Sequence, residues 1–396
     1  MKINSTILAA AIGLASVSLV SAQQYVYITG STAARGAVYN ALVSGVGFDN
    51  AAGVVSASYG SSNPTNGSYM VFSNTVTSAG VTTPTIVKCH WSGSEAGVVD
   101  VSGAVNESFL TDSTIEGGNS TAGPTGTQLI TNTVDLALAD NALAYSKNSA
   151  SSATQKGPIV VVPFVFVKNT TTLPDAGNIA NITDNNFKVL AGGGDYISLF
   201  TGNTGDTNYV YLAGRDDNSG TRVNTLGDTG YGIAKNVNQI QLSGGQMSPA
   251  GYTDEGQSSG GTLAQSLNDT SSALDPIQTG IKGYNVYGFV AVAYLGLADD
   301  ATAEGLAGGS TPPTPACTRL TYNGVAYSTA AVEDGTYAFW GNEYILHSAT
   351  ASAQAIPFWN ALGNKTTGIS AYTDNYEIPL ANMHVTRSGP LNPPVY

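Results

Sequence analysis

The chain repeats one local pattern: an apolar run, a turn rich in glycine, serine and threonine, and then a segment that favours a helix. The runs at 25–28, 85–91 and 209–212 all follow this pattern. Strands that alternate with helices in this way predict an α/β sheet. Two longer charge-free runs, 159–167 and 287–295, are typical of strands buried on both faces.

The remaining elements are expected from shorter signals. Thr183 precedes a helical pattern and is expected to cap its N-terminus. Further strands are predicted at 134–140 and 337–340, and helices at 37–43, from about 96, at 182–187, 221–226 and 351–362. The sequence Asn-Gly within 322–325 predicts a hairpin turn. Polar, glycine-rich segments predict loops with short strands at 50–68 and 74–84, and a loop insertion at 111–127.

The strongest candidate for a binding site is the turn after the 209–212 run. It holds Arg215, Ser219, Gly220 and Thr221 at the start of a predicted helix. The N–H groups of a first helical turn lack partners inside the helix, and together with the helix dipole they favour an anion. Arg215 adds a planar fork of donors that suits a phosphate-like group. The competing interpretation is a solvated turn with an ordinary helix cap.

Two other turns and one acid occupy comparable positions. Ser31 and Thr32 follow the first predicted strand, Ser94 follows the 85–91 run, and Asp140 ends the 134–140 run. Each residue alone is more often structural. In open α/β sheets ligands bind at the C-terminal ends of the strands, so these side chains are expected to converge there.

No nucleophile–base constellation and no metal-ligand spacing is evident in the sequence. The glycine-rich tracts lack the Gly-Lys-Ser/Thr ending of a nucleotide-binding loop. His90, His347 and His384 do not have the spacing of metal ligands. We therefore expect neither an enzyme nor a cofactor. A formal net charge of −13, with only 10% charged residues, argues against a nucleic-acid partner.

The first 22 residues read as a secretory signal peptide. Lys2 precedes a short apolar run, and small residues end it at Ala22. No later stretch is long and apolar enough to cross a bilayer. The mature protein is expected to be periplasmic or secreted, without insertion into a membrane.

Two cysteines and one arginine are each open to more than one interpretation. In an oxidising compartment Cys89 and Cys317 favour a disulfide, but two buried thiols are the alternative. Arg222 is expected to be a surface residue of the helix that follows the Arg215 turn.

The order of these motifs resembles the phosphate-binding proteins of ABC transporters, within the type II periplasmic binding-protein superfamily. The strand-one loop is Thr29-Gly30-Ser31-Thr32, the second loop is 93–97, and the third element is 138–142. Arg215-Asp216-Asp217-Asn218-Ser219-Gly220-Thr221 is close to the family's Arg-x-Asp-x-Ser-Gly-Thr. The resemblance implies these ligand-binding residues: Thr32, Ser94, Asp140, Arg215, Ser219, Gly220 and Thr221, with Ser31 and Arg35 as additional candidates.

The resemblance also implies an architecture. It predicts a two-lobed α/β protein with two mixed-sheet domains and a ligand cleft between them. The first domain would comprise 23–163 and 290–396 and the second 164–289, with hinge strands around Phe164 and Phe289. This division puts both cysteines in one lobe, which favours a disulfide. The implied ligand is inorganic phosphate or a similar oxyanion, the implied partner is a membrane ABC permease, and the protein is expected to be a monomer.

In the family pattern, Asp140 accepts a hydrogen bond from a protonated phosphate and repels a fully ionised sulfate. Arg35 stands where the family has other residues, and insertions lie at 50–84 and 104–130, so a different or larger anion remains open. A second hypothesis is a secreted surface or structural protein without a ligand. It would be favoured if the cleft lacked room, or if Arg215 paired only with protein carboxylates. An extracellular hydrolase is disfavoured because the sequence shows no nucleophile–base constellation.

Overall fold

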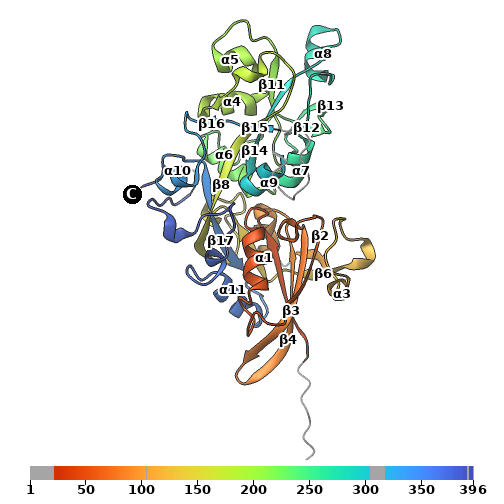
Figure 1. Ribbon diagram of the computed structural model, residues 1–396, viewed down its shortest axis with the longest axis vertical. Helices are drawn as coiled ribbons and strands as arrows, with labels where there is room; N and C mark the ends of the chain where they lie inside the picture. The colour runs from red at the N-terminus through yellow and green to blue at the C-terminus, as the bar shows by residue number, and fades with distance from the viewer. Residues whose placement is uncertain (1–21, 104, 304–316, 390–391, 396) are drawn as a thin grey trace, which may run out of the picture.

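The computed structural model describes residues 22–103, 105–303, 317–389 and 392–395. The predicted signal peptide, apart from Ala22, lies outside these residues. Figure 1 shows two lobes stacked along the long axis of the molecule, with two long strands running between them. The fold is mixed α/β. Within the described residues, no helix is long and apolar enough to span a membrane.

One mixed sheet of 11 strands runs through both lobes. Its path begins in one lobe with β10 (Asp195–Tyr196), β11 (Tyr209–Leu212), β14 (Val290–Gly296) and β8 (Thr154–Asn169). It continues in the other lobe with β17 (Trp340–His347), β7 (Leu136–Ala139), β1 (Gln24–Gly30), β4 (Val81–His90), β3 (Tyr69–Ser78) and β2 (Val55–Tyr59). β15 (Cys317–Arg319) pairs with β8 beside this path.

β8 is the strand that joins the two halves of this sheet. Its first ten residues pair with β17, and residues 164–168 pair with β14. The predicted charge-free strand at 159–167 is confirmed, and its residues are buried. A strand buried on both faces must be apolar throughout, which is why this run contains no charge.

The largest hydrophobic cluster lies where β8 passes from one half to the other. Phe164 and Phe166 of β8 pack there against Phe339, and the rings of Phe166 and Phe339 are stacked with centroids 4.7 Å apart. A second cluster packs α1 (Arg35–Val43) and α11 (Ala355–Leu362) against the first half of the sheet. A third lies between α7 (Gly260–Ser266) and the second half.

The helices that concern the site are short. They are α2 (Ser94–Gly103), α4 (Asp184–Gly192), α6 (Gly220–Asp228) and α9 (Leu297–Ala303). The outer elements are α3 (Thr114–Gly117), β5 (Asn106–Leu110), β6 (Leu129–Thr133), α5 (Ile197–Thr201), β12 (Gln239–Ser243), β13 (Gln246–Thr253), α8 (Pro276–Lys282), α10 (Thr329–Glu333), and the pair β9 (Asn181–Ile182) and β16 (Thr321–Tyr322). Thr183 caps α4 as predicted, since its side chain accepts from the N–H of Asn186.

Two sequence-based expectations about secondary structure differ from the structure. Residues 74–84 are not loops but part of a hairpin, in which β3 and β4 pair over ten residues around a turn at Ala79 and Gly80. Both turn residues have positive φ, as tight hairpin turns require. The strands on either side of the turn consist largely of polar residues, and for that reason the composition of 74–84 resembled that of a loop. The last strand begins at Trp340 and extends to His347, later than predicted.

The predicted disulfide is wrong. Cys89 lies in the hydrophobic cluster around β1 and α1, whereas Cys317 begins β15 and packs in the cluster around α7. No disulfide joins them. Both side chains are buried, and burial raises the pKa of the Cys89 thiol well above its usual value.

The predicted division into domains remains a prediction. The strand pairing places β14 beside residues 164–168 of β8, and β15 beside residues 167–169. A boundary drawn from the sheets would therefore fall after β15 rather than before β14. The chain returns to the first half of the sheet with β17.

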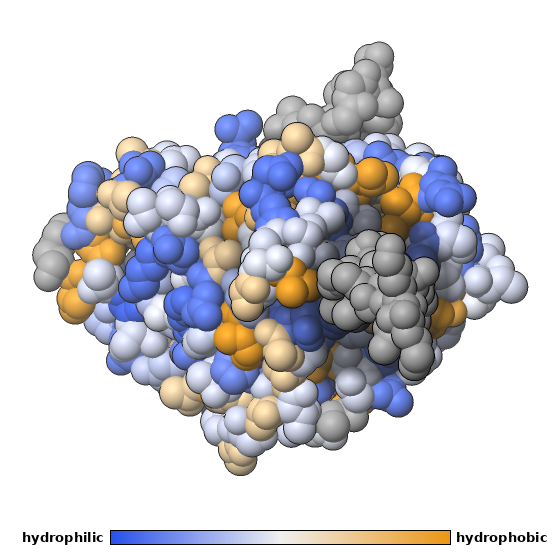
Figure 2. All heavy atoms as spheres, turned by 90° about the horizontal axis from the view of Figure 1, so that it is seen from below, coloured by the Kyte–Doolittle hydropathy of each residue, from blue (hydrophilic) through white to orange (hydrophobic). Residues whose placement is uncertain are grey.

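The surface is weakly polar, in keeping with the 10% of charged residues. The face shown in Figure 2 mixes hydrophilic, pale and hydrophobic residues without one continuous apolar field.

Candidate functional site

The site begins with three turns at one edge of the sheet. β1 runs parallel to both β4 and β7, so the C-terminal ends of these strands lie side by side. Ser31 follows β1, Ser94 begins α2 just beyond β4, and Asp140 follows β7. All three side chains are buried. The sequence pattern alone therefore located three neighbouring strand ends.

The opposite side of the site is the turn between β11 and α6. Ser219 caps α6, and its hydroxyl accepts from the backbone N–H of Arg222 at 3.2 Å. The predicted helix after Thr221 is confirmed, and it begins at Gly220. The first turn of α6 faces the strand ends described above.

Asp140 is the centre of the contacts between the two sides. The hydroxyl of Ser94 donates to its Oδ1 at 2.8 Å, and the hydroxyl of Thr221 donates to its Oδ2 at 3.4 Å. The backbone N–H of Glu95 also donates to the carbonyl of Asn218 at 3.0 Å. Ser94 and Asp140 from one half of the sheet and Thr221 from the other are thus brought together.

The contact is tight at Gly220. A Cβ atom added there would lie 1.6 Å from Asp140 Oδ1 and 2.5 Å from the hydroxyl oxygen of Ser94. Only a glycine allows this approach. The groups expected to contact a ligand therefore contact one another, and a ligand can enter among them only if the two sides separate.

Burial raises the pKa of Asp140 to about 6, although the hydrogen bond from Ser94 and the charge of Arg215 oppose this shift. The nearby charge of Glu95 adds to the rise. A carboxyl group with this pKa changes from donor to acceptor within the range of ordinary buffers. The arrangement can therefore distinguish ligands by the protons they carry.

The raised pKa gives a testable pH dependence of stability. Between about pH 4 and pH 6 the folded protein holds a proton on Asp140 that the unfolded chain has released, so this group's contribution to stability falls as pH rises through that window. The loss is at most about 3 kcal/mol. The Asp140→Asn variant lacks this titrating group. In urea unfolding, its free energy of unfolding should therefore rise relative to that of the parent between pH 4 and pH 7. Parallel pH profiles of the two proteins would contradict the assignment.

Arg215 is held firmly on its own side of the site. Its backbone N–H donates to the hydroxyl of Tyr294 at 3.1 Å, and its carbonyl accepts from Gln239 and Arg222. Its guanidinium donates to the backbone carbonyls of Gln257 and Ser258 at 3.1 and 3.2 Å. These partners are carbonyls rather than carboxylates, so the charge of Arg215 is not neutralised by them, and it acts on Asp140.

Arg222 was expected at the surface, and this expectation is wrong. The residue is fully buried. Its guanidinium pairs with Asp254 at 2.5 Å and with Asp217 at 3.0 Å, and it donates to the carbonyl of Arg215 at 3.1 Å. Arg222 therefore fixes the backbone of the Arg215 turn from inside.

Arg35 pairs with an acid outside the group around Asp140. It is the first residue of α1, and its guanidinium pairs with Asp299 of α9 at 3.2 Å. Both side chains are less than a tenth exposed. The pair connects the two halves of the sheet, so Arg35 serves as a link between lobes in this state. Thr32, three residues earlier, is buried.

Sequence reasoning missed Glu343. This residue lies in β17, has no exposed surface, and accepts from the hydroxyl of Ser31 at 3.0 Å. Burial, together with the charge of Asp140, raises its pKa well above its usual value. The available signal was an acid within the otherwise apolar and uncharged run around Tyr344 and Ile345.

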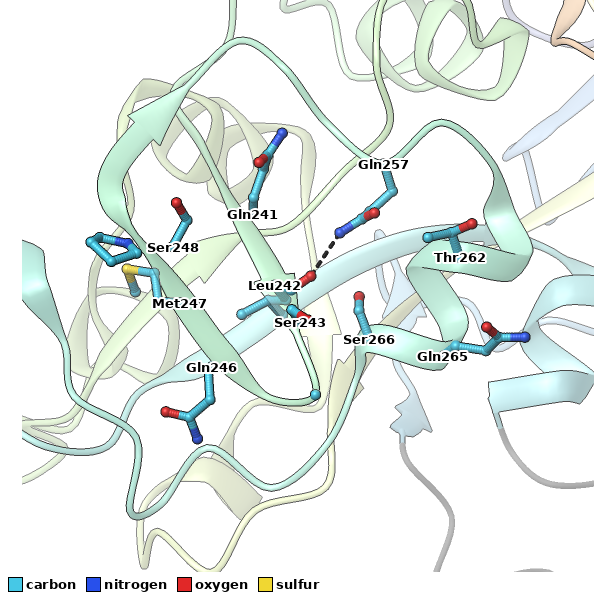
Figure 3. Close-up of a pocket in the computed structure, with 12 residues that line it drawn as sticks. Gln241, Leu242, Ser243, Gln246, Met247, Ser248, Gln257, Thr262, Gln265 and Ser266 are labelled. Carbon is cyan, nitrogen blue, oxygen red and sulfur yellow. Dashed lines mark hydrogen bonds between the residues drawn. The ribbon is translucent and has the colours of Figure 1, made fainter.

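The space beside Asp140 is small. The cavity there, between Asp140, Asn224 and Arg387, has a volume of about 10 Å³, which is close to the space that one water needs. A much larger hollow of about 610 Å³ lies between the β12–β13 hairpin and α7 (Figure 3). Its lining includes four glutamines and no charged side chain, so it offers nothing to balance the charge of an anion.

Comparisons with known proteins give structural similarities only. No family model matches the chain, and no curated protein matches it. One similar structure is that of a phosphate ABC transporter substrate-binding protein, so named, from Clostridium perfringens with bound phosphate. It aligns with a TM-score of 0.46 and 13% sequence identity, and the alignment covers 90% of this chain and 100% of the other. An ABC-type phosphate transport receptor from Vibrio cholerae aligns at 0.42 and 13%, covering 89% and 99%. At these values the similarity alone assigns no function.

Proposed function

We propose that the protein is an extracytoplasmic solute-binding protein that captures a tetrahedral oxyanion, phosphate first among them, between its two lobes. The observation that carries the proposal is the meeting of Asp140 with Ser94 from one side and with the first turn of α6 from the other. A carboxyl acceptor, hydroxyl donors, a helix N-terminus and the charge of Arg215 are complementary to a protonated oxyanion.

The expected roles of these groups follow from their chemistry. The N–H groups of the first turn of α6 and the guanidinium of Arg215 would donate to the oxygens of the anion, at about 1.5–3 kcal/mol for each charge-assisted bond. Ionised Asp140 would accept from a hydroxyl of the anion. Sulfate at neutral pH carries no such proton and would leave Asp140 buried and unpaired, which is an effective form of discrimination.

Binding in this scheme requires the lobes to open and close. The direct contact between Asp140 and Gly220 corresponds to a closed state, in which Arg35 and Asp299 are also paired. A ligand that touches both lobes favours closure because it interacts with the closed state more strongly than with the open one.

The wider setting of this function is proposed on the same basis. The N-terminal signal-peptide pattern at 1–22 supports a periplasmic or secreted location. Delivery to a membrane ABC permease, and action as a monomer, are what the resemblance of the four motifs implies. Neither a cofactor nor catalysis is needed.

Isothermal titration calorimetry with phosphate, sulfate and molybdate at pH 6 and pH 8, after removal of co-purified ligand, tests the proposal. Phosphate should bind, and Arg215→Ala should weaken it by about 10- to 100-fold because one charge-assisted contact is lost. Lys235→Ala, which removes an exposed cation in the same lobe, is the matched control and should bind like the parent. No heat with any of the three anions would refute oxyanion capture.

A structural role without a ligand is the second candidate. The observation in its favour is the mutual satisfaction of Ser94, Asp140 and Thr221. The pairing of Arg215 with carbonyls rather than carboxylates speaks against it. Small-angle X-ray scattering of the ligand-free protein separates the two candidates, because a binding protein should contract when phosphate is added and a structural protein should not.

A further inference from the structure

We propose that the hollow between the β12–β13 hairpin and α7 is a second binding site, and that its ligand is a short, uncharged oligosaccharide. This proposal goes beyond oxyanion capture and does not depend on it. None of the residues expected to bind the anion lines this hollow.

Two segments form the walls of the hollow. The hairpin contributes residues 241–244 and 246–249, and the segment that leads into and through α7 contributes residues 257, 262, 265 and 266 (Figure 3). The volume of about 610 Å³ falls within the range of about 300–1,000 Å³ that is typical of small-molecule sites. The side-chain amide of Gln257 donates to the carbonyl of Leu242 at 2.8 Å, so a direct hydrogen bond connects the two walls.

The lining carries polar groups but no charge. Four of the chain's 11 glutamines lie there, together with serine and threonine hydroxyls. Four further hollows each contain at least one charged side chain, among them Asp206, Asp228 and the Arg35–Asp299 pair. An ion or a zwitterion in the uncharged hollow would lose water and gain no counter-charge, so the lining favours a neutral ligand.

Several of these polar groups make no hydrogen bond within the protein. The side-chain amides of Gln246 and Gln265 and the hydroxyl of Ser243 have no partner among the described residues. Each glutamine amide offers two donors and one acceptor. A sugar hydroxyl also donates and accepts, and neighbouring hydroxyls on one ring can therefore pair with both the nitrogen and the oxygen of one amide.

The hollow also has an apolar part. Leu242 and Met247 line it and are only 4% and 7% exposed. A sugar ring presents CH groups on its faces and hydroxyls at its edge, so it is complementary to both parts of the lining. A wholly apolar ligand would cover the amides without pairing them. An extended peptide is recognised mainly through main-chain hydrogen bonds to a strand edge, whereas this lining offers side-chain groups.

A neighbouring hollow favours a chain of sugar units over a single one. Thr262 and Gln265 of α7 also border a second hollow, of about 160 Å³, whose lining includes Ser61 and Ser68 from the other half of the sheet. Arg35 and Asp299 lie there too, but they pair with each other. A chain that extends over α7 would meet further hydroxyl groups, and a trisaccharide should bind more tightly than its monosaccharide.

Saturation-transfer NMR of the purified protein with maltotriose, cellotriose, mannotriose and chitotriose tests the proposal. At least one trisaccharide should respond, and its affinity should fall by about 10-fold or more in the double variant Gln246→Ala with Gln265→Ala, because hydrogen bonds from two amides are lost. Gln354→Ala is the matched control and should bind like the parent. Its side chain makes no capping hydrogen bond at the start of α11, in the other half of the sheet.

Three results would overturn the proposal. They are no response with any of the four trisaccharides, undiminished binding in the double variant, and a response with N-acetyl-triglycine amide but with none of the sugars. The two replaced side chains are exposed and have no protein partner, so the melting temperature of the double variant should match that of the parent.

Phosphate titrations separate this proposal from oxyanion capture. The double variant should bind phosphate like the parent, because neither replaced residue belongs to the group around Asp140. Failure of the sugars to bind leaves oxyanion capture standing. Failure of phosphate to bind leaves the oligosaccharide site standing, since the two sites have separate linings.

Discussion

Replacing Gly220 with alanine should prevent the lobes from closing. The added Cβ would meet Asp140 Oδ1 at 1.6 Å and the side chain of Ser94 at 2.5–2.7 Å, so rotation of Asp140 alone cannot relieve the clash. Overpacking of this kind costs about 1–3 kcal/mol. Because the cost falls on the closed state, we expect phosphate affinity to drop by about 10- to 100-fold, and small-angle scattering should report a larger radius of gyration than in the parent.

The control for this variant is Gly280→Ala in α8. Nothing lies within 4 Å of a Cβ atom at that position, and alanine favours a helix over glycine. It should leave affinity and radius unchanged and raise the melting temperature slightly. If Gly220→Ala behaved like Gly280→Ala, the contact between α6 and Asp140 would not limit closure.

Replacing Arg222 with methionine should be the most destabilising single change at the site. It leaves the carboxylate of Asp254 without its cation and removes one of the two side-chain donors to the carbonyl of Arg215. Removing one member of a buried ion pair typically costs about 3–5 kcal/mol. We expect a clear fall in the urea midpoint, and also weaker anion binding, because the Arg215 turn loses its internal support.

Lys147 provides a control that shares a partner with Arg222. Both cations pair with Asp217, but Lys147 does so at the surface, where the carboxylate is 59% exposed. Lys147→Met should therefore cost no more than about 1 kcal/mol. Equal destabilisation by the two substitutions would show that burial of Arg222 contributes nothing beyond the surface pair.

Local sequence signals predicted most of the fold because they depend on local physics. The charge-free run at 159–167 could only be a strand covered on both faces, and it is the strand on which both halves of the sheet depend. The hairpin at 69–90 was missed because an exposed arm needs no apolar alternation, and its threonines and asparagines resemble a loop. The disulfide was wrong because no local signal indicates that β15 pairs with the far end of β8, in the half of the sheet away from Cys89.

Site residues could be predicted where a local motif determines the backbone. They could not be predicted where the interaction partner is distant in the sequence. Ser94, Asp140 and Gly220 could be placed together because strand ends and helix starts converge at one edge of a sheet. The burial of Arg222 depends on Asp254, 32 residues away, and the partner of Arg35 lies 264 residues away. No periodicity connects such residues, and the same holds for Ser31 and Glu343, 312 positions apart.

The strand β8 has a thermodynamic consequence as well as an architectural one. Its 16 residues supply ladder hydrogen bonds to β17 at one end and to β14 and β15 at the other. Neither half of the sheet can lose β8 without exposing apolar strands on both sides of the junction. Melting of one lobe thus removes an edge from the other, and we expect the two lobes to unfold as one cooperative unit.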